Sequence, residues 1–171
     1  MNISNKEKWI IFFIGGCLGA VLFLLIFGWD KLDVTYTDWL LRKDTDLAQH
    51  YMGWCTYRAS DWHYPLGLMD GVLYPDSISI FFTDSIPLFA FVFKLLSGIL
   101  PESFQYFGLF GFLCYFLQGG FAACLIFHYT NKKIYSIVGS LFFSGSLLMM
   151  WRMFTHTALS AHFLILAALY L

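Results

Sequence analysis

Long apolar runs alternate with one polar stretch along the chain. The first run, residues 9–28, has no charged residue over about 20 positions, the length that spans a ~30 Å hydrocarbon core. Residues 29–85 alternate poorly and carry turn signals such as Pro65-Leu66-Gly67 and Asp70-Gly71, so we expect short helices and turns there. Further apolar runs cover residues 86–100, 106–127, 134–151 and 158–171. The pattern predicts an all-α, polytopic transmembrane helical bundle with a large first loop.

Flanking charges indicate which runs span. Two lysines, Lys6 and Lys8, precede the first run, which favours a cytoplasmic N-terminus. The run is long and is followed by no small-residue cleavage site, which favours an uncleaved anchor over a signal peptide. The run 86–100 would reach only ~22 Å as a helix and contains Lys94, so we expect an interfacial helix there. The expected arrangement has spans at 9–28, 106–127, 134–151 and 158–171, an outer loop at 29–105, and a cytoplasmic Lys132-Lys133 pair.

Composition fits a membrane protein. The 171 residues are 59% hydrophobic and 12% charged, against roughly 25% charged residues in soluble domains. This composition disfavours a disordered chain and a nucleic-acid binder. All nine aspartates lie between Asp30 and Asp84, so the outer loop faces water. The last run reaches Leu171 without a polar flank, from which we expect a fragment of a longer transmembrane domain.

The most regular part of the outer loop, residues 44–58, is predicted to be a helix. One face at i, i+3/i+4 spacing contains Asp46, Gln49, His50, Gly53, Trp54 and Tyr57. The side chain of Thr45 or Asp44 could cap its first turn. The face could contact a ligand, or the helix could lie at the interface with its polar groups in water and lipid headgroups.

Other polar residues stand at unusual places. His63 precedes a Pro/Gly turn, and Asp84 stands at the start of an apolar run, where it could be a helix cap or part of a site. Arg152 and His156 are i, i+4 neighbours, and His162 lies within the final apolar run. Ionisable residues inside spans are functional candidates, although Arg152 could equally anchor a helix at the interface.

With these residues, the chain resembles the N-terminal part of GT-C glycosyltransferases. Asp46…His50 and His63-Tyr64-Pro65-Leu66-Gly67 are similar to the acidic motif and the His-Pro-Pro-Leu-Gly turn of protein O-mannosyltransferases. Asp84 before Ile86-Pro87-Leu88 resembles the acid that precedes a helix-opening proline in aminoarabinose transferases. The chain is also similar to a bacterial membrane family of this type marked by Asp-x-x-Gln-His-x-x-Gly-Trp and Thr-Asp-Ser-Ile-Pro-Leu.

The resemblance implies an enzyme of the bacterial inner membrane. It would move a sugar from a polyprenyl-phosphate donor to a glycan, lipid or protein acceptor, at a site outside the cytoplasm. Such transfer needs a base, for which a partly buried Asp46 is our choice, and partners for the departing phosphate. We expect substrate contacts from Gln49, His50, Trp54, Arg58, His63, Arg152 and His156. We also expect Asp84 and His162 as ligands of a divalent metal. The alternative function is a non-enzymatic membrane protein (a transporter part or an envelope-polysaccharide assembly subunit).

Overall fold

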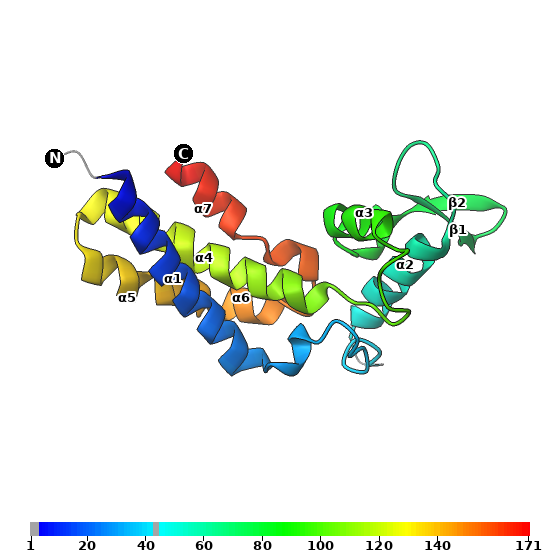
Figure 1. Cartoon of the computed structure of the whole chain (residues 1–171), viewed down its shortest axis with the longest axis horizontal. Helices are drawn as coiled ribbons and strands as arrows, with labels where there is room; N and C mark the ends of the chain where they lie inside the picture. Colours follow the sequence, from blue (N-terminus) through cyan, green and yellow to red (C-terminus); the bar gives the residue numbers. More distant parts are fainter. Residues whose placement is uncertain (1–3, 43–44) are drawn as a thin grey trace. The chain divides into compact units, whose positions relative to one another are not determined.

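The computed structural model describes residues 4–42 and 45–171, which are mostly helical and contain seven α-helices. It divides into two compact units (Figure 1). The helical unit contains the described residues of Met1–Leu32, Phe107–Met153 and Leu159–Leu171. The loop unit contains those of Asp33–Tyr106 and Phe154–Ala158. The mostly helical fold agrees with the sequence-based expectation, apart from one β-hairpin in the loop unit.

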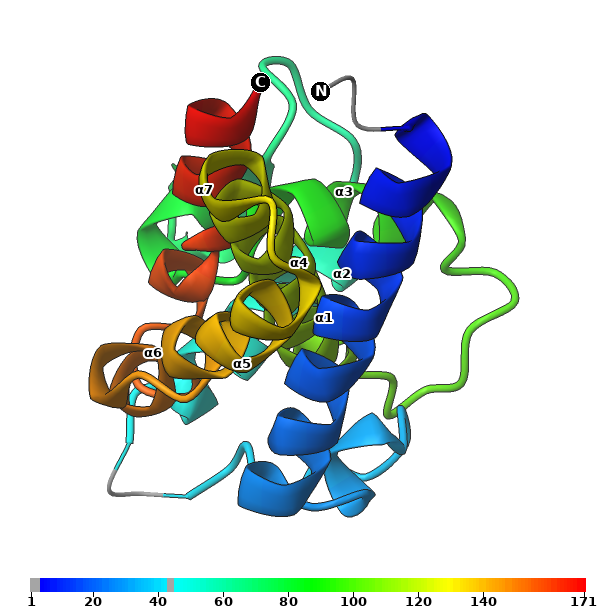
Figure 2. The ribbon, with the colours of Figure 1, turned by 90° about the vertical axis from the view of Figure 1, so that its left-hand side faces the viewer.

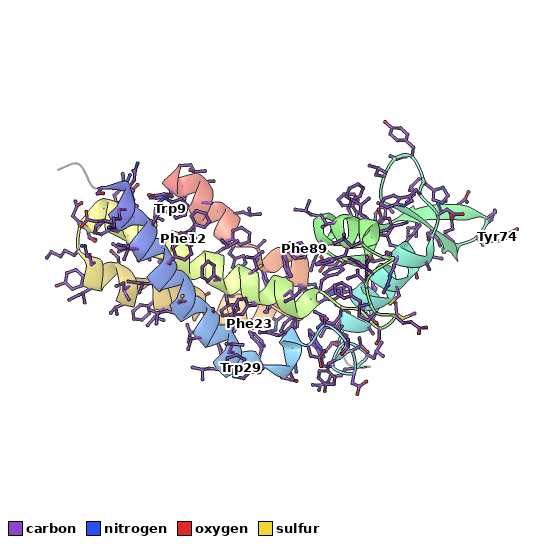
Figure 3. All side chains as sticks on the ribbon, in the orientation of Figure 1. Trp9, Phe12, Phe23, Trp29, Tyr74 and Phe89 are labelled. Atoms are coloured by element: carbon purple, nitrogen blue, oxygen red, sulfur yellow. The ribbon has the colours of Figure 1, made fainter. Side chains whose placement is uncertain are left out.

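Two long helices, α1 (Asn5–Phe27) and α4 (Phe107–Thr130), pack together in the helical unit (Figure 2). Glycines bring their backbones into contact: a Cβ atom on Gly19 would lie 2.1 Å from the Tyr115 carbonyl oxygen. Phe12 and Phe23 of α1 (Figure 3) meet rings of α4 edge-on, with centroids 5.1 and 6.0 Å apart. Close packing through small residues is common between helices in membranes.

Both helices are long and apolar enough to cross a membrane. At 1.5 Å per residue they measure about 35 Å, which exceeds the ~30 Å hydrocarbon core. The run 134–151, which we expected to be a single span, is divided into α5 (Lys133–Ser144) and α6 (Leu147–Arg152). The Gly145 N–H closes α5, and Ser146 caps α6 by accepting a hydrogen bond from the Met149 N–H at 3.3 Å. The final run is likewise divided into η3 (Thr157–Ser160) and α7 (Phe163–Tyr170).

The N-terminus of α1 and the turn between α4 and α5 lie at the same end of the helical unit. Lys133 Nζ forms an ion pair with Glu7 Oε1 at 2.8 Å, joining the first turns of α5 and α1. Lys6 and Lys8 flank Glu7 in sequence, and Lys132 precedes Lys133. These basic residues therefore lie at the same end of the helical unit as the ion pair.

The loop unit is built around an aromatic core. Its elements are α2 (Leu47–Ala59), β1 (Leu68–Leu73), β2 (Asp76–Ser79), η2 (Ile80–Thr83) and α3 (Pro87–Leu95). The Trp54 side chain is buried, and its indole N–H donates to the Phe104 carbonyl at 2.9 Å. The Gln105 main chain and side chain donate to the carbonyls of Val34 and Asp33 at 2.7 and 2.8 Å, which joins the two ends of the unit.

The hairpin corrects the expectation that residues 29–85 form only short helices and turns. Strands β1 and β2 pair antiparallel, with Leu68 opposite Ser79. We had interpreted Asp70-Gly71 as a turn, but it lies inside β1, where Gly71 has a φ of +84° next to an irregularity in the register. The turn itself follows β1, at Tyr74-Pro75, with Tyr74 exposed (Figure 3). Strands this short give too few alternating positions for a clear period-two signal.

The helix α3 turns its charge inward. At nine residues it measures about 14 Å, too short to cross a bilayer. Lys94 Nζ lies 4.1 Å from the ring centroid of Tyr57 and 4.6 Å from that of Trp62, in cation–π contacts. Leu88 and Val92 are exposed on the other side. The exposed side of α3 is therefore apolar, and its lysine is buried.

Candidate functional site

Two polar side chains meet where the connection from η2 to α3 passes α2. His50 Nε2 lies 3.5 Å from Asp84 Oδ2. The His50 side chain is 3% exposed, and the Asp84 side chain is 30% exposed. The backbone N–H of Ala158 also donates a hydrogen bond to the Asp84 carboxylate. Only Asp84 of this pair is therefore open to a substrate.

Burial moves the pKa values of this pair toward each other. It lowers the pKa of the His50 imidazole, because the imidazolium loses its hydration, and the negative charge of Asp84 opposes that shift. Burial raises the pKa of the Asp84 carboxyl, and the positive charge of a protonated His50 opposes it. His50 Nδ1 is buried and has no hydrogen-bond partner in the part of the chain that the structure describes. A carboxylate whose pKa is raised is a stronger base than an ordinary one, which suits it to accept a proton.

Asp46 and His156 act on the pair electrostatically. The charge of Asp46 raises the pKa of both His50 and Asp84, whereas that of His156 lowers both. Asp46 occupies the N-cap position of α2, but its side chain makes no capping hydrogen bond, and the residue is exposed. The expected partial burial of Asp46 is therefore wrong, and the half-buried acid is Asp84. The N-cap residue of α2 is thus Asp46 and not the Thr45 that we expected. The alternative cap, Asp44, lies outside the described residues.

An apolar cavity of about 500 Å³ adjoins the pair, within the size range of ligand pockets. Ala158 lines the cavity, and its backbone N–H donates to Asp84, so the carboxylate is hydrogen-bonded to a residue of the cavity wall. Ile86 and Pro87, close to Asp84 in sequence, also line it. Other lining residues are Tyr57, Leu66, Ile80, Phe81, Leu88 and Phe91. This arrangement can hold an apolar ligand with a polar end at Asp84.

The family model described as a domain of unknown function (DUF6311) matches residues 16–171. The chain belongs to the DUF6311 family. No curated protein and no solved structure matches it. The range matched by DUF6311 contains His50, Asp84 and the residues that line the cavity.

Three residues of this DUF6311 chain that we expected to contact the substrate are instead buried or hydrogen-bonded to the main chain. The Arg58 guanidinium donates to four main-chain carbonyls at 2.8–3.2 Å, so it is already occupied. Trp54 is fully buried and cannot stack on a sugar. Gln49 is exposed, and its amide N–H donates to the Phe82 carbonyl at 3.4 Å. On the predicted face of α2, His50 is the residue whose side chain lies beside Asp84.

His63 belongs to a separate cluster at the base of the hairpin. Its Nε2 lies 2.5 Å from Asp70 Oδ2, and the Ser77 hydroxyl donates to Asp70 Oδ1 at 2.7 Å. The Asp70 N–H donates in turn to Ser60 Oγ at 3.0 Å. Hydrogen bonds of Asp70 thus connect His63, the second strand and the residue that ends α2.

Arg152 and His162 both belong to the helical unit, where Nη1 of Arg152 lies 3.5 Å from Nε2 of His162. His156, expected beside Arg152, belongs to the loop unit with Asp84. Within residues 4–42 and 45–171, no three His, Cys, Asp or Glu side chains gather in a way that could hold a metal ion. The described residues therefore offer no ligand set for the metal expected at Asp84 and His162.

Sequence reasoning missed two contributors to the DUF6311 site. One is the Ala158 backbone N–H, which no side-chain pattern could indicate. The other is Ser85, whose hydroxyl donates to the His50 carbonyl at 2.6 Å. The sequence placed Ser85 in the Thr-Asp-Ser-Ile-Pro-Leu motif without giving it a role of its own.

Proposed function

We propose that the chain is part of a membrane glycosyltransferase that moves a sugar from a polyprenyl-phosphate donor to an extracytoplasmic acceptor. The observation that carries this proposal is the half-buried Asp84 carboxyl, which lies beside His50 and accepts a hydrogen bond from Ala158, a residue that lines an apolar cavity. A lipid-linked sugar has the matching two parts, an apolar chain and a polar reacting end. The resemblance of the motifs around Asp46, His63 and Asp84 to GT-C enzymes supports the same activity.

Asp84 is the proposed general base. Its carboxylate takes the proton of the acceptor hydroxyl while that oxygen bonds to the anomeric carbon of the sugar. The bond from the anomeric carbon to the donor phosphate oxygen breaks, and polyprenyl phosphate leaves with the bonding electrons. Because burial raises the pKa of Asp84, its carboxylate is a stronger base than an exposed one. His50 is too buried to reach a substrate and acts by orienting Asp84.

The membrane arrangement is part of this proposal. Helices α1 and α4 supply two spans, and the apolar stretches 134–151 and 158–171 complete a polytopic bundle in the bacterial inner membrane. The loop unit then lies outside the cytoplasm, where the flipped donor lipid presents its sugar. Its exposed apolar residues beside the cavity, Leu66, Phe81 and Leu88, fit a site that draws its donor from lipid.

The proposal is tested with Asp84→Asn in the full-length protein. Membranes containing the variant are assayed with labelled polyprenyl-phosphate hexoses and pentoses. Since asparagine keeps the shape but cannot take a proton, we expect transfer to fall by at least 100-fold. The matched control is Asp76→Asn, an exposed aspartate of the hairpin, which should keep full transfer.

Asp46→Asn separates the two candidate bases, because Asp46 is exposed and acts only through its charge. We expect a loss smaller than tenfold there. Full loss in Asp46→Asn with transfer retained in Asp84→Asn would return the role of base to Asp46. Absence of transfer from every polyprenyl-phosphate sugar would contradict the proposed activity.

A further inference from the structure

The polar site includes a strained segment, Asp84-Ser85-Ile86. Asp84 and Ile86 both have left-handed backbones, with φ of +52° and +50°. This conformation is uncommon for residues other than glycine, asparagine and aspartate, and a β-branched residue such as Ile86 is an outlier there. Strained backbones persist only where the surroundings hold them firmly, and they concentrate at functional sites. What holds this segment therefore helps to place Asp84.

Ser85, between the two strained residues, is completely buried and bonded on both sides. Its hydroxyl donates to the main-chain carbonyl of His50 at 2.6 Å. Thr83 Oγ1 lies 2.7 Å from the same hydroxyl oxygen. The Ser85 carbonyl accepts a hydrogen bond from the Tyr106 hydroxyl. Ser85 is thus attached directly to the residue whose imidazole faces Asp84.

A glycine of helix α2, Gly53, allows this segment to approach the helix closely. A Cβ atom on Gly53 would lie 2.3 Å from Thr83 Oγ1 and 2.5 Å from Ser85 Oγ, so any larger residue would push the segment away. Gly53 lies about one helical turn beyond His50, on the same side of α2. The close approach and the Ser85 hydrogen bond therefore act at the same place on the helix.

We infer that Ser85 is a positioning residue: by bonding to the main chain of His50, it holds the strained segment against α2 and sets the Asp84 carboxylate beside the His50 imidazole. Ser85 itself touches no substrate, because it is completely buried. The inference rests on the proposed function, which gives Asp84 its chemical role. The contact that Ser85 maintains can nevertheless be measured without any transfer reaction.

The test follows the His50 imidazole by NMR in ¹⁵N-histidine-labelled protein. The chain has five histidines, and His50→Gln assigns the signal. The Asp84 charge raises the pKa of His50, so releasing Asp84 should lower the titration midpoint. We expect Ser85→Ala to lower it by about 1 pH unit, the usual effect of losing an opposite charge at this range. Ser97→Ala, at another loop-unit serine whose hydroxyl donates to the Phe93 carbonyl at 3.5 Å, should leave it unchanged.

A double-mutant cycle decides whether Ser85 acts through Asp84. In the Asp84→Asn background, Ser85→Ala should produce no further shift. An equal shift in both backgrounds, or a rise of the midpoint through water entry, would show a merely structural serine and overturn the inference. If Ser85→Ala leaves the His50 midpoint unchanged in the protein that keeps Asp84, the inference is overturned too.

Tyr106→Phe provides a second route if Ser85→Ala does not fold. It removes the hydrogen bond to the Ser85 carbonyl and should shift the His50 midpoint in the same direction by a smaller amount. An unchanged midpoint in a folded Tyr106→Phe protein would count against the inference. Because the NMR readout needs no sugar donor, failure of the proposed transferase activity would be seen separately, in the transfer assay.

Discussion

The Arg58 guanidinium stabilises the main-chain segment that follows α3. Its two terminal nitrogens donate to the carbonyls of Ser97, Leu100, Pro101 and Glu102. Carbonyls at and beyond a helix end lack helical partners, so a side chain that supplies several donors stabilises the turn. Arginine does this with a planar fork of five N–H groups, whereas lysine has one point of attachment.

Arg58→Lys should therefore destabilise the protein although the charge is kept. We expect a loss of about 2 kcal/mol, since hydrogen bonds from a charged donor contribute roughly 1.5–3 kcal/mol each and lysine retains some of them. Denaturant titration of the detergent-solubilised protein measures the loss. Arg42→Lys, at an exposed arginine of the same unit, should change stability by less than about 0.5 kcal/mol. Unchanged stability of Arg58→Lys with impaired sugar transfer would favour the phosphate-binding role expected from the sequence.

At the scale of elements, contact between α1 and α4 depends on missing side chains. A Cβ atom on Gly119 would lie 2.2 Å from the Gly15 carbonyl oxygen, and backbone atoms cannot move aside singly. At Gly139 of α5, by contrast, the nearest atom is Ile126 Cδ1, the flexible end of a side chain. At Gly119 backbone atoms of α1 would have to move, whereas at Gly139 only the end of one side chain would.

Gly119→Ala should thus separate α1 from α4, and we expect it to cost about 1–3 kcal/mol. Gly139→Ala adds the same methyl group where Ile126 can rotate, so it should cost less than about 1 kcal/mol. Thermal unfolding of both variants in one detergent gives the comparison. Equal melting temperatures would mean that the two helices do not need their backbone contact.

Elements and site differed in how far sequence could predict them. The long uncharged runs of α1 and α4 were predictable because twenty apolar residues have one common solution, a helix. The division of residues 134–151 at Gly145 and Ser146 depends on capping, which average apolarity does not register. Periodicity placed His50 on one face of α2 with Asp46 and Gln49, but periodicity describes neighbours within one helix. The partner of His50, Asp84, comes from a different segment, and its burial depends on packing that includes Ala158.

At the scale of the whole molecule, the helical unit has a basic end. The Lys133–Glu7 ion pair brings the N-terminus of α1 to the turn after α4, where Lys6, Lys8 and Lys132 also occur. At the other end of these helices, Gly108 of α4 approaches the Lys31 carbonyl so closely that a Cβ atom would overlap it. Residues 31 and 108 at this end of the helical unit lie close in sequence to the boundaries of the loop-unit segment 33–106. Since basic residues favour the cytoplasmic side, the two ends should face opposite sides of a membrane.

Cysteine labelling tests this orientation. In a protein whose native cysteines are replaced, a cysteine at exposed Asp76 should react with a membrane-impermeant thiol reagent added to spheroplasts. A cysteine at exposed Lys132 should react only after the membrane is permeabilised, because the reagent cannot cross the bilayer to the basic end. Reaction at Lys132 from outside with protection at Asp76 would reverse the orientation. Reaction of both from outside would mean either that residues 86–100 cross the membrane after all or that α1 and α4 do not, and protease accessibility of the N-terminus in the same spheroplasts separates these two cases.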